Sequence, residues 1–194
     1  MTTTTGIDDI IRLRRTIKPV FMNGQRIPDG VIRELLELGD WAPTHAHTEP
    51  WYFVVYAGDG VRQFCRDHAE LYRLNTPADR YTTAAYEKLE TMGKTVSHVI
   101  ALCMKRGDNP KIPEQEELVA TACAAQNILL GAAARRLAVY WGTGGMNYHP
   151  AMKEYLGLEE ADKVLGFLYL GYAEGALAPG QRIKPLAQKV RWVE

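Results

Sequence analysis

The segment that most constrains the fold is an unusually small and apolar stretch, VATACAAQNILLGAAA, at residues 119–134. A polar Gln-Asn pair interrupts it and two arginines close it, which leaves it short of the ~20 apolar residues that a membrane span requires. We therefore expect a buried helix of a soluble protein, from about Glu114 to Leu137. Its acidic start and basic end suit the helix dipole, and its alanines and glycine allow neighbouring elements to approach closely.

Four apolar segments rich in β-branched and aromatic residues predict strands, and the unbroken apolar run of the last one indicates burial on both faces. They lie at residues 51–56 (WYFVVY), 96–104 (VSHVIALCM), 138–145 (AVYWGTGG) and 163–172 (KVLGFLYLGY). Helical patterns are expected at residues 7–15, 31–42, 61–94 with a break near Pro77, and 149–158. No internal repeat or change of composition divides the sequence, so residues 1–194 are expected to form one domain.

The charge balance excludes whole-surface attraction to nucleic acid or to anionic membranes. Lysine plus arginine number 23, and aspartate plus glutamate also number 23, so any anion must be bound by a local cluster. The first residues lack an apolar core of signal-peptide length, which predicts a cytoplasmic protein. Three scattered cysteines without a CxxC pair fit reduced, packed thiols rather than a disulfide framework or a zinc site.

A pair of arginines follows the first expected helix. Arg14 lies seven residues after Ile7, and Arg15 lies four after Ile11, so the helical period places both cations along the apolar stripe that should be buried. Complementing the helix dipole would explain their charge but not their direction. With Thr16, the arginines could hold a phosphate by charge-assisted hydrogen bonds.

The segment WAPTHAHTEPW, residues 41–51, contains two histidines, a glutamate and a tryptophan at each end. In an extended chain His45, His47 and Glu49 would project to one side, so a metal site is conceivable. Ligands this close in sequence strain a tetrahedral shell, and no HExxH motif or cysteine pair supplies further ligands. Surface histidines on a loop remain an open alternative.

The segment WGTGGMN, residues 141–147, ends a strand in glycines, whose backbone N–H groups can approach a ligand closely. It only partly matches a dinucleotide fingerprint, and a plain glycine turn is an equally good interpretation. Trp41, His45 and Trp141 could border a flat ring beside the arginine pair, which together indicate a nucleotide-like cofactor. Hydrolase and phosphoryl-transfer motifs are not found in the sequence.

At this point the sequence resembles the nitroreductase family of flavin enzymes over nearly its whole length. RRT at residues 14–16 resembles the family's Arg-Arg-Ser signature, and APTHAHTEPW resembles its Ala-Pro-Ser-x-x-Asn-x-Gln-Pro-Trp segment. YWGTGG and KVLGFLYLGY resemble its later glycine turn and final strand. The likeness is strongest to the short bacterial, YdjA-like minimal nitroreductases.

The resemblance implies an α+β, nitroreductase-like fold with a central mixed, mostly antiparallel sheet flanked by helices. It also implies an intertwined homodimer with FMN at the subunit interface. By the same resemblance, one subunit would contact the FMN phosphate, ribityl chain and ring edge through Arg14, Arg15 and Thr16, and line the isoalloxazine through Trp141, Gly142 and Thr143. Trp41 and His45 would come from the partner.

The implied activity is that of an FMN-dependent NAD(P)H oxidoreductase. NADH or NADPH would reduce the flavin and leave, and a nitroaromatic, quinone or similar small acceptor would then be reduced. No side chain is expected to be a catalytic nucleophile and no metal is expected, although His45 could assist as a hydrogen-bonding group. The alternative is a flavin-binding sensor of the same fold without turnover.

Several positions depart from the family pattern or remain unassigned. His47, Glu49 and Gly142 stand where the family carries asparagine, glutamine and, in the short subgroup, arginine, so they are candidates for specificity. GAAARR, residues 131–136, falls where a nicotinamide nucleotide has been proposed to bind in that subgroup, but the packed end of a buried helix explains it as well. No role is assigned to Arg182 or Lys184.

Overall fold

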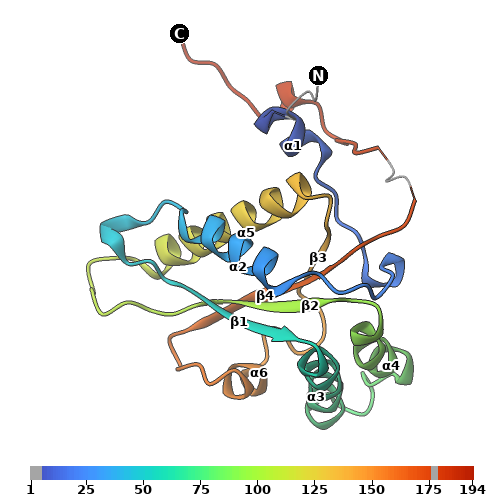
Figure 1. Cartoon of the computed structure of the whole chain (residues 1–194). Helices are drawn as coiled ribbons and strands as arrows, with labels where there is room; N and C mark the ends of the chain where they lie inside the picture. The colour runs from blue at the N-terminus through green and yellow to red at the C-terminus, as the bar shows by residue number, and fades with distance from the viewer. Residues whose placement is uncertain (1–5, 176–178) are drawn as a thin grey trace.

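One four-stranded sheet organises the protein in the computed structural model, which describes residues 6–175 and 179–194. The strands lie in the order β1-β2-β4-β3, and each pairs antiparallel with its neighbours. Their bounds are β1 Trp51–Ala57, β2 His98–Met104, β3 Ala138–Gly142 and β4 Lys163–Gly171. All four strands predicted from the sequence are therefore present, and β1 and β3 form the two edges (Figure 1).

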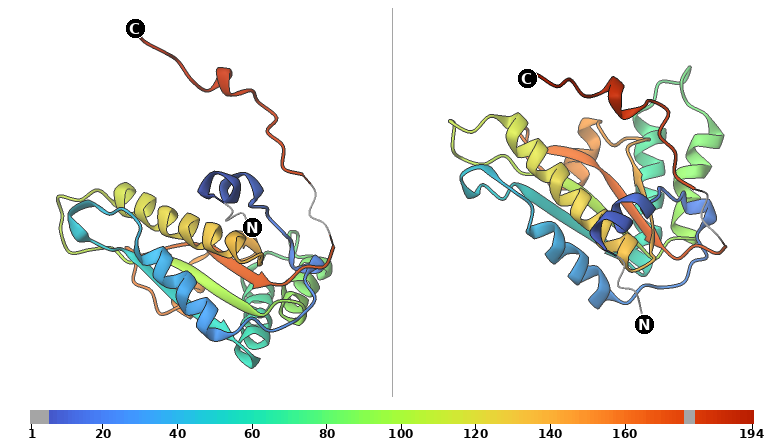
Figure 2. Two further views of the ribbon diagram at one scale, coloured as in Figure 1. Left: turned by 45° about the horizontal axis from the view of Figure 1, so that its top comes forward. Right: turned by 90° about the horizontal axis from the view of Figure 1, so that it is seen from above.

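Helices cover both faces of this sheet (Figures 1 and 2). One face carries α2 (Asp29–Asp40) and α5 (Glu114–Ala134), and the other carries α3 (Asp59–Asn75), α4 (Thr83–Thr91) and α6 (Pro150–Tyr155). The remaining helical elements are α1 (Ile7–Leu13) and short 3-10 turns at Pro19–Phe21, His45–His47, Met92–Lys94 and Leu186–Gln188. The expected break near Pro77 is confirmed, because it separates α3 from α4.

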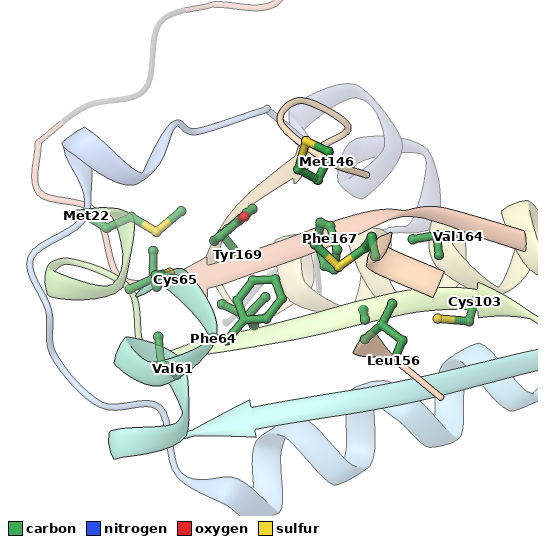
Figure 3. Packing of buried hydrophobic residues seen from close by; sticks show 14 of the residues in the cluster. Met22, Val61, Phe64, Cys65, Cys103, Met146, Leu156, Val164, Phe167 and Tyr169 are labelled. Atoms are coloured by element: carbon green, nitrogen blue, oxygen red, sulfur yellow. The ribbon is translucent and has the colours of Figure 1, made fainter. Parts of the chain in front are cut away.

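Successive residues of the central strands face opposite sides of the sheet, so the hydrophobic core forms two layers. On β2, Ile100 and Leu102 face α2 and α5, whereas Val99, Ala101 and Cys103 face α3 and α6. All seven residues of β2 are buried, which fits the apolar run that follows His98 in this strand. Figure 3 shows the second layer, in which Phe64 of α3 packs against Phe167 of β4.

The apolar helix α5 is buried on only one side. Its 21 residues are long and apolar enough to cross a membrane, but half of that window packs inside the protein. Gly131 lets Leu38 of α2 approach so closely that a Cβ there would lie 2.5 Å from the leucine side chain. The other side exposes Leu118 and Val119. The prediction of a buried helix is thus correct for one face of α5. The other face is uncovered in a single chain.

The prediction that α1 buries an apolar stripe with the arginines is wrong. None of the residues of α1 is buried, and the helix ends at Leu13. Arg14 has ψ 129°, outside the helical range, and beyond it the Ile17 N–H donates to the carbonyl of Val139 at 3.0 Å. A helix of two turns gains little from its own hydrogen bonds, so attachment to the edge of β3 decides the direction of the chain here.

Candidate functional site

Strand β3 is the structural centre of the candidate site, because most of the predicted residues lie on it or beside it. The segment after α1 follows this edge strand, held by the Ile17 hydrogen bond and by the Thr95 hydroxyl, which donates to the Pro19 carbonyl at 2.8 Å. It thereby places the arginines next to the start of β3 and the end of α5 (Figure 1).

An open cavity of about 610 Å³, which we call the arginine cavity, lies at this junction. Arg14 is half-buried in its wall, and its side chain makes no hydrogen bond or ion pair within the described part of the chain. Arg15 also lines the cavity, but its guanidinium donates to the carbonyls of Arg12 and Arg14 at 2.6 and 2.9 Å. The two predicted arginines thus line the same cavity, but the guanidinium of Arg15 already makes hydrogen bonds and that of Arg14 makes none within the described residues. Thr16 is exposed beside them.

Further along β3, Tyr140 borders two more cavities, of about 570 and 160 Å³. Lysine side chains line them: Lys18 and Lys94 the larger one, and Lys88 both. The smaller cavity also reaches Gly142, one of the predicted glycine-turn contacts, which thus shares a cavity with Lys88. Lys18 follows the arginine pair in the same extended segment, which is a partial signal in the sequence, whereas no signal marks Lys88 or Lys94.

The glycine turn after β3 is fixed from beneath by His68 of α3. The Nε2 of His68 accepts a hydrogen bond from the Met146 N–H at 3.0 Å, and a Cβ at Gly145 (φ +66°) would lie 2.5 Å from that nitrogen. Burial between Phe64 and Phe167 lowers the pKa of His68 to about 4. The imidazole is therefore neutral near pH 7 and can act as the acceptor. This role was not predicted from the sequence.

Trp141 does not line the cavities of Lys18, Lys88 and Lys94, and its own cavity is lined by two other lysines, Lys153 and Lys163. Its indole N–H donates to the Leu165 carbonyl at 3.1 Å, and its ring lines a cavity of about 540 Å³ together with Leu118 and Val119 of α5. Because successive residues of a strand face opposite sides, Tyr140 and not Trp141 shares a cavity with Gly142. Thr143 is exposed just beyond the strand.

The histidine segment is not extended, so the geometric premise of the metal hypothesis is wrong. Residues 45–47 form a 3-10 turn, and Ala46, His47 and Glu49 have positive φ angles of 50°, 54° and 44°. His45 Nδ1 instead contacts the carboxylate of Glu116. Within residues 6–175 and 179–194, no group of three or more His, Cys, Asp or Glu side chains could hold a metal ion.

His45 and Trp41 lie at a distance from the arginine cavity within one chain. His45 lines a separate open cavity of about 670 Å³ with Pro43, Glu116 and Cys123. Trp41, which caps α2, is 86% exposed. The predicted site residues therefore fall into several places, and a single chain does not gather them around one ligand.

A Ser-His-Asp arrangement occurs elsewhere, in which Ser97 and His98 are buried and Asp29 is exposed. Ser97 Oγ lies 2.8 Å from His98 Nδ1, and His98 Nε2 lies 3.2 Å from Asp29 Oδ1. Ser97 Oγ also accepts the Ile27 N–H at 2.7 Å, and the serine is buried. A nucleophile so enclosed cannot reach a substrate, and the network instead joins the start of α2 to β2.

Comparison with known proteins shows the family. The family model described as the Nitroreductase family matches residues 11–172. A protein of Escherichia coli (strain K12), provisionally named NAD(P)H nitroreductase YdjA, is 28% identical over 140 residues, which cover 72% of this chain and 74% of that protein. A nitroreductase-like family protein from Bacillus cereus has a TM-score of 0.82 and 28% identity, over 100% of this chain and 99% of the other.

The fold extends to more distant structures. The FMN-dependent nitroreductase NfnB from Mycobacterium smegmatis, solved in complex with NADPH, has a TM-score of 0.71 and 17% identity, over 96% of this chain and 97% of the other. The family match and the name of the Escherichia coli relative agree with the predicted class of enzyme, an NAD(P)H nitroreductase, and the predicted α+β fold is confirmed. The chain belongs to the nitroreductase family.

Proposed function

We propose that this protein is an FMN-dependent NAD(P)H oxidoreductase of nitroreductase type, acting on a nitroaromatic, quinone or similar small acceptor in the cytoplasm as a single domain. The observation that carries the proposal is the unpaired Arg14 in a cavity beside β3, with lysines lining cavities further along the same strand. A phosphate at one end and an electron-accepting ring at the other would match these two groups of cations.

The residues present fit FMN on both counts. The arginine cavity has no acidic side chain among its described lining residues, so a phosphate would meet no opposing charge. At the other end, Gly144 leaves the backbone open, whereas the rings of Tyr140 and Tyr169 pack against Gly142. In this arrangement Arg14 and Thr16 would hold the phosphate, and the glycine turn would meet the ring.

When bound, FMN would supply the hydride acceptor and donor, and the protein would supply position and electrostatics. Lys18, Lys88 and Lys94 would stabilise negative charge that develops at the ring edge on reduction. Lysines rather than arginines line the cavities near Gly142, whereas the arginines line the arginine cavity. His68 would keep the turn in place without touching the cofactor.

A second copy of the chain would complete the site as an intertwined homodimer. Three features support this: the uncovered apolar side of α5, the position of Trp41 and His45 apart from the arginine cavity, and the exposed arm at residues 179–194. The arm leaves the body of the protein (Figure 2), and its Ile183 and Trp192 are 93% and 86% exposed. Large exposed apolar side chains of this kind mark interaction surfaces.

In that dimer, the partner would present Trp41 and His45 to the ring. His45 Nδ1 contacts Glu116, so its Nε2 is the nitrogen left to hydrogen-bond a ligand or to deliver a proton. Trp141 would meet the ligand from a different cavity than the one that Lys88 shares with Gly142. No side chain is required as a covalent nucleophile.

The decisive experiment is an absorption spectrum of the purified protein, after addition of FMN if it is colourless. We expect flavin bands, bleaching by NADH or NADPH under anaerobic conditions, and recovery of the oxidised spectrum when a quinone or nitroaromatic is added. Flavin that binds but is not bleached by either donor would favour the non-catalytic sensor. Protein that takes up no FMN would refute the proposal.

A further inference from the structure

Arg136 occupies a backbone position that normally favours glycine. Helix α5 ends at Ala134, Arg135 is its C-cap, and Arg136 follows with φ +56°. The residue just after a C-cap is commonly glycine, because a side chain in the left-handed region costs conformational energy. A non-glycine residue held in such a conformation is a reason to ask what its side chain does.

The side chain of Arg136 lines the arginine cavity together with Arg14. Like Arg14, it makes no hydrogen bond or ion pair with the residues that the structure describes. Its neighbour differs, because Arg135 donates to Glu34 at 2.8 Å and to the Gly131 carbonyl at 3.2 Å. Arg135 therefore already complements the carboxyl end of the helix, and that function does not account for Arg136.

We propose that Arg136 binds a phosphate monoester jointly with Arg14, and that this is the phosphate of FMN; the inference rests on the proposed function. Two unpaired guanidinium groups in one cavity can each donate a pair of parallel hydrogen bonds to phosphate oxygens. The described lining of the cavity has no carboxylate to compete for them. The site thus retains an arginine where glycine would give a less strained turn.

The substitution Arg136→Gly separates phosphate binding from a structural role. It should raise the stability of the apoprotein and lower its affinity for FMN. Relief of the left-handed backbone should raise the melting temperature of the apoprotein by about 2 °C. Loss of a charge-assisted hydrogen bond should weaken FMN binding by about 10- to 100-fold, measured by quenching of flavin fluorescence. Affinity for riboflavin, which lacks the phosphate, should stay unchanged.

Two controls accompany this variant. Arg136→Lys keeps the charge and the strained backbone, so it should lose less FMN affinity than the glycine variant and gain no stability. Arg135→Gln removes the positive charge of the preceding residue, which is already paired with Glu34. The ratio of FMN to riboflavin affinity should therefore match that of the wild type.

Other outcomes would overturn the inference in distinguishable ways. If Arg136→Gly binds FMN as well as the wild type does, the residue does not hold that phosphate. If FMN affinity is kept but the preference for NADPH over NADH is lost, the phosphate belongs to the dinucleotide instead. If wild-type protein binds neither FMN nor riboflavin, the proposed function itself fails, and this inference fails with it.

Discussion

The imidazole Nε2 of His68 accepts the backbone N–H of Met146 at 3.0 Å, which ties helix α3 to the glycine turn after β3. The histidine is 2% exposed, and Gly145 brings the backbone against its ring. A protonated imidazole has no acceptor nitrogen. The hydrogen bond therefore exists only while the buried histidine is neutral, and this couples the turn to pH.

We predict that acid weakens the fold through His68. Burial lowers its pKa in the folded state from 6.5 to about 4, so below pH 6.5 the unfolded chain binds the proton first. This residue has no effect above pH 6.5, and its contribution to the free energy of unfolding falls as the pH drops from 6.5 to 4, by on the order of 3 kcal/mol in total.

Urea denaturation at pH 7.5 and pH 5 measures this effect. In His68→Gln the amide oxygen can still accept the Met146 N–H but does not titrate, so its stability should fall less between the two pH values. A variant as sensitive to acid as the wild type would show that other groups dominate in this range.

A second prediction concerns Gly166 in the middle of β4. Its φ is +142°, and a Cβ would lie 2.3 Å from the Trp141 indole nitrogen and 2.9 Å from the Gly142 carbonyl. Gly166→Ala should therefore displace Trp141 and lower the free energy of unfolding by about 2 to 4 kcal/mol. Gly157→Ala is the matched control, because its φ is +65° but nothing lies within 4 Å.

Denaturation curves of the two variants separate steric conflict from backbone strain. Gly157→Ala should cost only about 1 kcal/mol. Equal losses in both variants would mean that the close approach of Trp141 is not important for stability.

The elements of this fold could be predicted because their signals are local. Strand β4 is an unbroken apolar run after Lys163, and its burial on both faces follows from that run. The close contact of Gly131 with α2 likewise follows from the small residues of α5. Both signals depend on which residue types are neighbours in sequence, and no distant contact is needed to read them.

The parts of the site that were missed depend on contacts between distant residues. His68 and Met146 are 78 residues apart, and nothing near either position in the sequence indicates that they meet. The expected direction of the arginines failed for a related reason, since the Ile17 hydrogen bond to Val139 overrides the short helical period of α1. The expected extended chain at residues 45–49 is wrong for a similar reason, because His47 has a positive φ angle that its sequence neighbours do not predict.

A third prediction tests the placement of Arg14. Arg14→Ala should weaken FMN binding by about 1 to 3 kcal/mol, because it removes an otherwise unpaired guanidinium from the arginine cavity. Arg12→Ala removes a neighbouring exposed cation outside that cavity and should bind FMN normally. Titration of both apoproteins with FMN makes the comparison, and equal affinities would contradict the placement.

The last prediction concerns the uncovered side of α5. Val119 is 55% exposed, and it lines both the cavity of His45 and the cavity of Trp141. If a second copy packs there, Val119→Glu would bury an unpaired carboxylate at the interface, which costs several kcal/mol. Light scattering after size exclusion should then show a monomer, and FMN affinity should fall because the partner's contacts are lost. Leu74→Glu alters an apolar residue of α3 that is 67% exposed, and this variant should remain dimeric with wild-type FMN affinity. A Val119→Glu protein that stays dimeric would place the interface elsewhere.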